Sequence, residues 1–308
     1  MPLPDHGRFA YSPITERAEI SWPGGARLAL YVAVAIEHFP YGEGAAGLSL
    51  SEGIPQPNTF NWAWREYGNR IGGFRLLDAL RSAGIPPTVL LNTSCYEHCP
   101  ELIAAYRDAD AEFVAHGVTN AVHPNGLGLE EERAMLIAAR DDIAAAEGSP
   151  PGGWMSPGAN PSAHTEDLLA ELGYRYTLDW PHDEQPNWMR TEAGPLLSIP
   201  YPHELNDVPM VVLHHASGAD FAEAVVDGVD ELIERSAEAP LVCGIVAHTF
   251  IVGQPHRLRR FRRALAHIAG NGDAVWLTTP GAIAERYTTQ VPAPSRSRRT
   301  STDVDSSH

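Results

Sequence analysis

The sequence predicts a single α/β domain in which strands and helices alternate around a parallel sheet or barrel. Strand-like and helix-like segments alternate from about residue 27 to residue 288, which is the pattern of consecutive βα units. The first strand, residues 27–36, is an apolar run without polar alternation, as expected when both faces of a strand are buried. A chain of 308 residues with 44% apolar residues is long enough to bury one large core.

The other predicted elements follow this strand in a regular order. Residues 39–58 form a long Gly/Pro-rich segment, and segments of this length usually build a lid or a wall of a binding site. Residues 129–147 repeat apolar side chains with a period close to 3.6, as in an amphipathic helix, and Gly148 ends it. Further helices are expected at residues 70–83, 100–108, 165–172, 220–235 and from 258 onward, and further strands at 87–92, 112–115, 153–155, 174–180, 196–201, 242–247 and 274–277.

The two ends of the chain and its net charge indicate which partners and which compartment the protein can have. The domain is expected to cover residues 18–288, after an N-terminal extension, residues 1–17, and before a Ser/Arg/Pro-rich disordered tail, residues 289–308. The net charge of -17 argues against a nucleic-acid partner, because phosphate binding needs a clustered basic surface. The N-terminus lacks the pattern of a secretory signal, and no later run is long enough to span a membrane. We therefore expect a cytoplasmic protein without a membrane partner.

Ionisable or polar side chains follow several of the apolar strands, at the point where each strand ends. Barrels of βα units build their active sites at this edge, because the carboxyl ends of parallel strands lie on the same side. The sequence therefore predicts one shared cavity that holds carboxylates and imidazoles. The residues at these strand ends are Glu37, His38, His116, Asp179, His203, Glu204, Asn206, Asp207 and His248.

Three of these residues have the chemistry that amide hydrolysis requires. Glu37 directly follows a buried strand, where a carboxylate is costly unless it is paired or used. It can take a proton from water as a general base, provided that the cavity raises its pKa towards neutrality. His248 can then protonate the departing nitrogen, because amines are poor leaving groups until they are protonated. His116 would position or polarise the carbonyl group. The alternatives are that Glu37 anchors a loop and that His116 is a satisfied core histidine.

The roles of the other polar residues stay open at this point. Asn206 and Asp207 suit a substrate with both donors and acceptors, such as a ureide or a cyclic imide, but both residue types are also common in turns. His38 faces the pocket only if its strand has already ended, because neighbouring strand residues point in opposite directions. For His123 a solvent-exposed loop position is expected. The sequence does not decide which of these histidines face the pocket: His38, His123, His182, His203, His214 and His215.

Six short segments carry a further signal through their order and spacing: AIEHF at residues 35–39, AHGVTN at 115–120, GWMSPGA at 153–159, LDWPHDEQP at 178–186, IPYPHELND at 199–207 and AHTFIVGQP at 247–255. Together they resemble the polysaccharide deacetylase (carbohydrate esterase family 4, NodB-homology) superfamily, and within it the allantoinase-like branch. The likeness covers roughly residues 18–288. It implies a distorted (β/α) barrel of the NodB type and a hydrolase that acts on carbon–nitrogen bonds other than peptide bonds.

The resemblance also implies roles for individual positions. In the metal-dependent deacetylases the first motif holds a base and a metal-binding acid, and the second motif is a His-x-x-x-His pair. Glu37 then matches the base, and His38 stands where the metal-binding acid would be. His116 matches the first histidine, Asn120 replaces the second, and His248 matches the acid histidine of the last motif. These replacements favour the metal-independent chemistry of allantoinase-like members, with Zn²⁺ or another divalent ion on His116 and His38 as the alternative.

Three functions compete on this basis. The leading one is hydrolysis of an amide, ureide or cyclic imide bond in a small polar metabolite by a homo-oligomeric enzyme. The second is metal-dependent N-deacetylation of a sugar or oligosaccharide, and the third, of a different class, is a catalytically inactive barrel that binds a ligand. In either enzyme, the expected substrate-binding residues are Asn120, Pro157, Asp179, Asp183, Glu204, Asn206 and Asp207.

Overall fold

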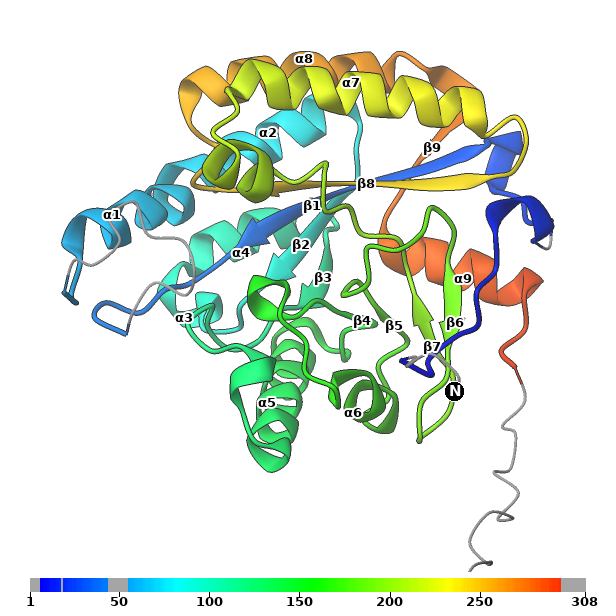
Figure 1. The fold of residues 1–308 in the computed structure, drawn as a ribbon. Helices are drawn as coiled ribbons and strands as arrows, with labels where there is room; N and C mark the ends of the chain where they lie inside the picture. Colours follow the sequence, from blue (N-terminus) through cyan, green and yellow to red (C-terminus); the bar gives the residue numbers. More distant parts are fainter. Residues whose placement is uncertain (1–5, 18, 44–54, 295–308) are drawn as a thin grey trace, which may run out of the picture.

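The computed structural model describes residues 6–17, 19–43 and 55–294 of the chain (Figure 1). Within these residues one sheet runs through the molecule in the order β6-β7-β5-β4-β3-β2-β1-β8, and β9 also pairs with β1. The β6–β7 pairing is antiparallel and the other described pairings are parallel. The strands are β1 (Leu28–Ile36), β2 (Pro87–Leu91), β3 (Glu112–Ala115), β4 (Gly153–Trp154), β5 (Tyr176–Thr177), β6 (Asn187–Met189), β7 (Leu196–Ser198), β8 (Leu241–His248) and β9 (Val275–Leu277).

The sheet is curled but not closed in the described part of the chain, because the hydrogen-bonded path ends at β6 on one side and at β8 on the other. Helices α7 and α8 run side by side over β8, and α2 packs against α8 (Figure 1). The predicted α/β fold is therefore confirmed, as an open form of the barrel. The helices are α1 (Thr59–Tyr67), α2 (Gly73–Ala83), α3 (Cys95–His98), α4 (Pro100–Arg107), α5 (Leu129–Glu147), α6 (Thr165–Glu171), α7 (Gly218–Arg235), α8 (Pro255–Ala269) and α9 (Pro280–Gln290).

Strand β1 is buried along its whole length, as its unbroken apolar sequence predicts. It pairs with β8 on one side, and with β9 and then β2 on the other. Its side chains alternate between two apolar clusters: Leu30 and Val32 belong to one, and Tyr31 and Ala33 to the other. Because β1 is central to the sheet and to both clusters, the residue that follows it is held in a fixed place.

Some elements differ from the sequence-based prediction. Helix α1 and strand β6 were not predicted, and the helix expected at residues 70–83 is preceded by a π-helical turn, Gly68–Gly72, that joins α1 to α2. In the sequence alone, the glycines at both ends of this turn suggest a loop. Here Gly72 lies against the backbone of Thr249, where a larger side chain would overlap the carbonyl oxygen, so glycine permits close packing rather than a turn.

The predicted chain ends are described only in part. The N-terminal extension is anchored through Arg8, whose guanidinium donates to the Asp167 carboxylate on α6 at 2.7 and 2.8 Å, and through Arg17, which pairs with Asp183 at 2.6 Å. Residues 44–54 of the predicted pocket wall and residues 295–308 of the predicted tail lie outside the described residues.

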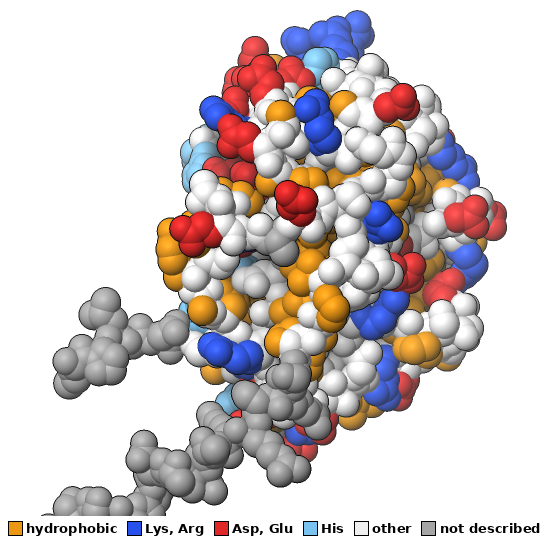
Figure 2. Space-filling model, turned by 90° about the vertical axis from the view of Figure 1, so that its right-hand side faces the viewer, with side chains coloured by type: hydrophobic (Ala, Val, Ile, Leu, Met, Phe, Trp, Pro, Cys, Tyr) orange, Lys and Arg blue, Asp and Glu red, His pale blue; other side chains and the backbone are white. Residues whose placement is uncertain are grey.

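One face of the surface carries acidic and basic side chains scattered among apolar ones, and neither charge gathers into a continuous patch on it (Figure 2). Among the described helices, none combines the length and the apolar composition needed to cross a bilayer.

Candidate active site

Three residues from distant parts of the chain meet at the carboxyl ends of β1, β3 and β8. Glu37 follows β1, His116 follows β3, and His248 is the last residue of β8. The Nε2 atoms of His116 and His248 lie 3.5 and 3.7 Å from Oε1 of Glu37. All three side chains are buried. The structure thus brings together the three residues that the sequence predicted as a catalytic group.

Asp207 holds the imidazole of His248 from behind. Its Oδ1 atom accepts a hydrogen bond from Nδ1 of His248 at 2.6 Å, and its Oδ2 atom accepts from the backbone N–H groups of His248 and Val252 at 2.9 and 3.3 Å. The Asp207 carboxylate is completely buried. Because Nδ1 donates to Asp207, Nε2 of His248 is directed at Glu37 and carries the proton that a charged imidazole can transfer.

The second imidazole is held by a backbone carbonyl instead of a carboxylate. Nδ1 of His116 lies 2.7 Å from the carbonyl oxygen of Met155, which can only accept, so Nδ1 carries the proton. The Nε2 atom of His116 is directed at Glu37, where it accepts when the ring is neutral and donates when the ring is charged. Only the charged ring contributes to the lowered pKa of Glu37. Pro157 contacts the turn next to it, since a methyl group on Gly117 would meet the Pro157 ring at 2.8 Å. An acceptor in this place suits the orientation of a water molecule.

Glu37 combines burial with several positively polarised neighbours. Nδ2 of Asn120 donates to its Oε1 atom at 3.0 Å. Burial alone would raise the pKa of Glu37, but His248, His116 and Arg65 together hold it below its usual value. The Oε2 atom of Glu37 and the Oδ1 atom of Asn120 are buried, and neither has a hydrogen-bond partner among the described residues. Two buried acceptors without partners would suit a bound water molecule or a substrate N–H group.

Two asparagines that the sequence analysis missed fix the backbone of the site. Asn92, just after β2, accepts from the backbone N–H of His38 at 3.0 Å and donates to the carbonyl oxygen of His116. Asn69, in the π-helical turn, donates to the carbonyl oxygen of Glu37 at 2.9 Å. Asn92 also occupies a strand end, and this position was the signal that could have identified it.

His38 belongs to a second polar group beside the first. Its Nδ1 atom lies 2.9 Å from the hydroxyl of Ser94, and its ring stacks on His98 with the centroids 4.1 Å apart. His98 in turn contacts Oε1 of Glu66 at 2.7 Å. Burial, and then the neighbouring His98, lower the pKa of His38. The predicted metal-binding pair of His116 and His38 is therefore divided between two groups of side chains.

The residues around Glu37 do not fit a resident metal ion. Among the described residues, no group of three or more His, Cys, Asp or Glu side chains is arranged to hold one. Asn120 also presents an N–H donor to Glu37, at the position where the resemblance places a second histidine ligand.

Two of the predicted substrate-binding residues, Asp179 and Asn206, hold backbone turns near the site through hydrogen bonds. Asp179 accepts from the backbone N–H and the hydroxyl of Ser156 at 2.6 and 2.8 Å, and thereby holds the turn that contains Met155 and Pro157. Asn206 accepts from the backbone N–H of Val208 at 3.0 Å, which supports the turn interpretation that the sequence left open.

Other predicted residues lie outside this group of contacts. Asp183 pairs with Arg17 and lines a separate hollow with His182, whose ring stacks on Phe9. His203, Glu204, His214 and His215 are exposed.

His123 corrects one expectation, because it is not a solvent-exposed loop residue. Its side chain is half-buried against Gly158 and Asn160, and its Nε2 atom has no hydrogen-bond partner among the described residues. Burial lowers the pKa of His123, and His116 and Glu37 both lie near enough to affect it. A backbone turn that the sequence pattern does not reveal brings this imidazole to the edge of the site.

Comparison with known proteins supports the family resemblance. Residues 66–177 match the family model of the polysaccharide deacetylases. An inferred polysaccharide deacetylase of Schizosaccharomyces pombe is 26% identical over 310 residues, which cover 94% of this chain and 93% of the relative. The matched family segment includes His116 and Asn120, while Glu37 and His248 lie outside it.

Two solved structures share the fold over most of their length. An inferred polysaccharide deacetylase of Pseudomonas aeruginosa PAO1 superposes with a TM-score of 0.79 at 26% identity, covering 89% of this chain and 95% of the other. A PuuE allantoinase superposes with a TM-score of 0.78 at 27% identity, covering 89% and 94%. The resemblance predicted from the sequence motifs is thereby confirmed.

Proposed function

We propose that this chain hydrolyses an amide-type carbon–nitrogen bond in a small polar metabolite, such as a ureide or a cyclic imide. Membership of this class of hydrolases follows from the comparisons, and the substrate is the proposal. The observation that carries it is the meeting of Glu37, His116 and His248 in one buried group, with Asp207 behind His248. The similarity to an allantoinase supports a ureide as the substrate.

The proposed reaction assigns one task to each side chain. Glu37 takes a proton from a water molecule that His116 orients, and the water oxygen attacks the carbonyl carbon. The Nε2–H of charged His248 then protonates the amide nitrogen, the carbon–nitrogen bond breaks, and the electron pair of that bond stays on the nitrogen. The products are a carboxylic acid and an amine or amide. A polarising role for His116 would require a proton on Nε2 as well, so water orientation is the role that its hydrogen bond to Met155 favours.

The substitution Glu37→Gln tests this proposal. It keeps the shape of the side chain but removes the base, so kcat should fall by about 10²- to 10⁴-fold. The assay is turnover of a panel that contains allantoin, hydantoins, cyclic imides and N-acetylated sugars, with and without a chelator. Glu238→Gln, at an exposed position, is the matched control and should keep wild-type activity.

Two results would count against the proposal. A fully active Glu37→Gln variant would exclude Glu37 as the base. Turnover confined to N-acetylated sugars and abolished by the chelator would favour the metal-dependent deacetylase instead.

We further propose that the enzyme is a homo-oligomer and that it acts in the cytoplasm. Besides other copies of the chain, its only binding partner would be the small-molecule substrate, without nucleic acid or membrane. Sedimentation of the purified protein would test the oligomeric state.

A further inference from the structure

A row of apolar side chains lies on the outside of the helical segment that α1, the π-helical turn and α2 form together. The row consists of Phe60, Ala63, Tyr67, Ile71 and Phe74, and we call these five residues the outer stripe. Residues three or four positions apart lie on the same side of a helix. Phe60 is 75% exposed, Ile71 40% and Phe74 37%, Ala63 is also exposed, and Tyr67 is half-buried.

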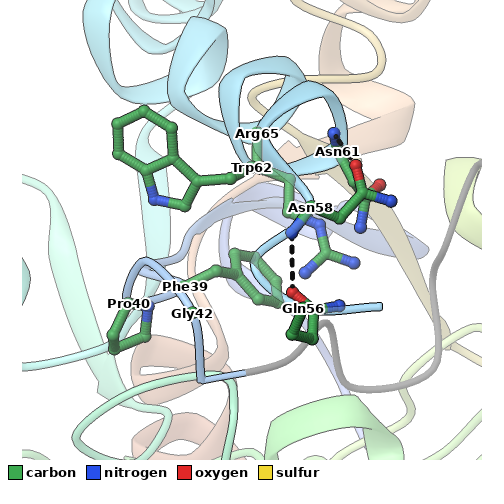
Figure 3. A pocket seen from close by; sticks show the side chains of 8 residues that line it. All are labelled: Phe39, Pro40, Gly42, Gln56, Asn58, Asn61, Trp62 and Arg65. Atoms are coloured by element: carbon green, nitrogen blue, oxygen red, sulfur yellow. Dashed lines mark hydrogen bonds between the residues drawn. The ribbon is translucent and has the colours of Figure 1, made fainter. Parts of the chain in front are cut away.

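The opposite side of the same helices faces the candidate active site. Asn69 donates from this inner side to the carbonyl oxygen of Glu37. Figure 3 shows another part of the inner side, with Arg65 of α1 beside the ring of Phe39. A surface helix that buries one side normally carries polar or charged residues on the other. The inner side therefore leaves the apolar residues of the outer stripe unexplained.

Helix α1 exposes no charged side chain, and the structure describes all of its residues. Its exposed residues are Thr59, Phe60 and Ala63, while Arg65 and Glu66 are buried. Charged residues are depleted at the centre of protein–protein interfaces, and aromatic residues are enriched there. The outer side of α1 thus has the composition of a contact surface.

The outer stripe has the same spacing in both directions from Tyr67, because its intervals are three, four, four and three residues. Two copies that cross at Tyr67 with antiparallel helices would place Phe60 of each copy against Phe74 of the other. Ala63 of each copy would likewise meet Ile71 of the other. A two-fold contact requires this self-complementarity, because residue i must fit residue j wherever j fits i.

The charges at the two ends of the segment favour the antiparallel arrangement. Glu43 is exposed near the first turn of α1, two positions after Tyr41, whose hydroxyl lies 2.8 Å from that of Thr59. The other end has a net positive charge, since its exposed ionisable residues are Arg70, Arg75, Asp78 and Arg81. Antiparallel copies bring the acidic end of one to the basic end of the other, whereas parallel copies would place the arginines against each other.

The exposed aromatic area is large enough for a stable contact. A fully exposed aromatic side chain has about 200 Å², so the 75%, 54% and 37% exposure of Phe60, Tyr41 and Phe74 corresponds to about 330 Å² on each copy. Two copies would cover about 660 Å² of aromatic surface. An interface of standard size buries roughly 1,600 Å², of which about 900 Å² is apolar. Ala63, Tyr67 and Ile71 add to the aromatic part.

We propose that two copies of this chain associate through the outer stripe, with their α1–α2 segments antiparallel about a two-fold axis at Tyr67. This inference gives a surface to the homo-oligomer proposed above, and it does not depend on the reaction that the enzyme catalyses. The contact would hold from outside the same helices that fix the backbone of Glu37 on their inner side.

The first test measures the dissociation constant of the dimer by sedimentation over a range of protein concentrations. Phe60→Glu introduces two charges into each two-fold contact, so Kd should rise by about 100-fold or more. Tyr11→Glu makes the same kind of change at an aromatic residue that is 91% exposed in the N-terminal extension. It is the matched control and should leave Kd unchanged.

A second set of variants tests the antiparallel arrangement. Ala63→Lys alone should weaken the dimer. Ala63→Lys combined with Ile71→Glu in the same chain should restore it, because the introduced lysine of each copy would face the introduced glutamate of the other. Ala63→Lys combined with Ile71→Lys should stay dissociated. In a parallel contact each introduced charge would face its own counterpart, and neither double variant would recover.

Each outcome decides a separate point. An oligomer whose Kd is unchanged in Phe60→Glu would overturn this inference and leave the proposed homo-oligomer intact. Wild-type protein that sediments only as a monomer would overturn both. Turnover by the wild type, measured in parallel, tests the proposed hydrolase independently of either result. Thermal unfolding checks that each variant is folded, and recovery in the Lys/Glu double variant could not result from misfolding.

Discussion

Single residues set the protonation states on which the proposed reaction depends. Burial alone would lower the pKa of His248, but the carboxylates of Asp207 and Glu37 outweigh it and raise this pKa above the usual value. Glu37 shows the opposite balance, because the surrounding positive groups outweigh its burial and lower its pKa. The lowered pKa of Glu37 is the opposite of the raised pKa that the sequence analysis expected for a general base in the cavity. The two effects favour a charged pair, in which Glu37 is deprotonated and His248 is protonated.

These pKa changes predict a bell-shaped dependence of kcat/KM on pH. The base must be deprotonated, so activity should fall as the pH decreases through a lowered Glu37 pKa, below about 4.5. The acid must be protonated, so activity should fall as the pH increases through a raised His248 pKa, above about 6.5. Asp207→Asn removes the charge behind His248 and should move only the alkaline limb, to lower pH. Lowering the His248 pKa by about one would reduce activity about tenfold above that limb.

A surface pair of the same chemistry supplies the control. His267 contacts Asp230 at 2.7 Å on the outside of the molecule, so Asp230→Asn removes an equivalent carboxylate far from Glu37. Its pH profile should match that of the wild type. An alkaline limb that stays in place in Asp207→Asn would show that His248 is not the acid.

At the scale of elements, close packing between α1–α2 and the end of β8 positions the site. The π-helical turn, Gly68–Gly72, carries Asn69 to the backbone of Glu37 and places Gly72 against Thr249, the residue after His248. Gly253 approaches Gly72 from the same segment. The elements that carry the proposed base and acid are thus held together through backbone contacts that leave no room for side chains.

This packing predicts that Gly72→Ala is destabilising and impairs activity. The added methyl group would overlap the carbonyl oxygen of Thr249, and backbone must move to accommodate it. We expect a loss of about 1–3 kcal/mol in the free energy of unfolding, measured by denaturant titration, together with a lower kcat. Gly126→Ala is the control, because a methyl group there meets no atom within 4 Å. Equal stability of the two variants would contradict this packing argument.

For the whole molecule, the buried carboxyl of Asp179 couples folding to pH. Burial raises the pKa of Asp179 to about 7, from 3.8 for an exposed aspartate. Between these two values the folded protein binds a proton that the unfolded chain has lost, so this group makes the free energy of unfolding decrease as the pH rises from about 4 to 7. A pKa that differs by one between the folded and unfolded states corresponds to about 1.4 kcal/mol, which makes the effect measurable.

Asp179→Asn should remove this part of the pH dependence. The asparagine does not titrate, and it keeps an acceptor for the N–H of Ser156. Denaturant unfolding at several pH values between 4 and 7 should therefore give a flatter curve than for the wild type. Asp273→Asn, at an exposed position, should leave the curve unchanged. Parallel wild-type and Asp179→Asn curves would refute the assignment.

Sequence alone determined the central strand and the residues at its end. An apolar run without alternation identifies a strand buried on both faces, and the parallel order of βα units places all strand ends on one edge. For that reason Glu37, His116 and His248 were predicted as one group, although more than 200 positions separate the first from the last. The buried strand was identified from a local apolar pattern. The shared edge of the strand ends was identified from the βα unit, which repeats along the chain.

Only the tertiary structure decided which polar side chains turn toward Glu37. It directs His38 to Ser94 and His98, and it buries half of His123 against Gly158 and Asn160. It also brings the charge of Arg65, from a helix that the sequence did not predict, near enough to lower the pKa of Glu37. Residues near strand ends share an edge, but the direction of each side chain depends on loop turns and helix packing. These are set by contacts between segments far apart in the sequence, which no local pattern records.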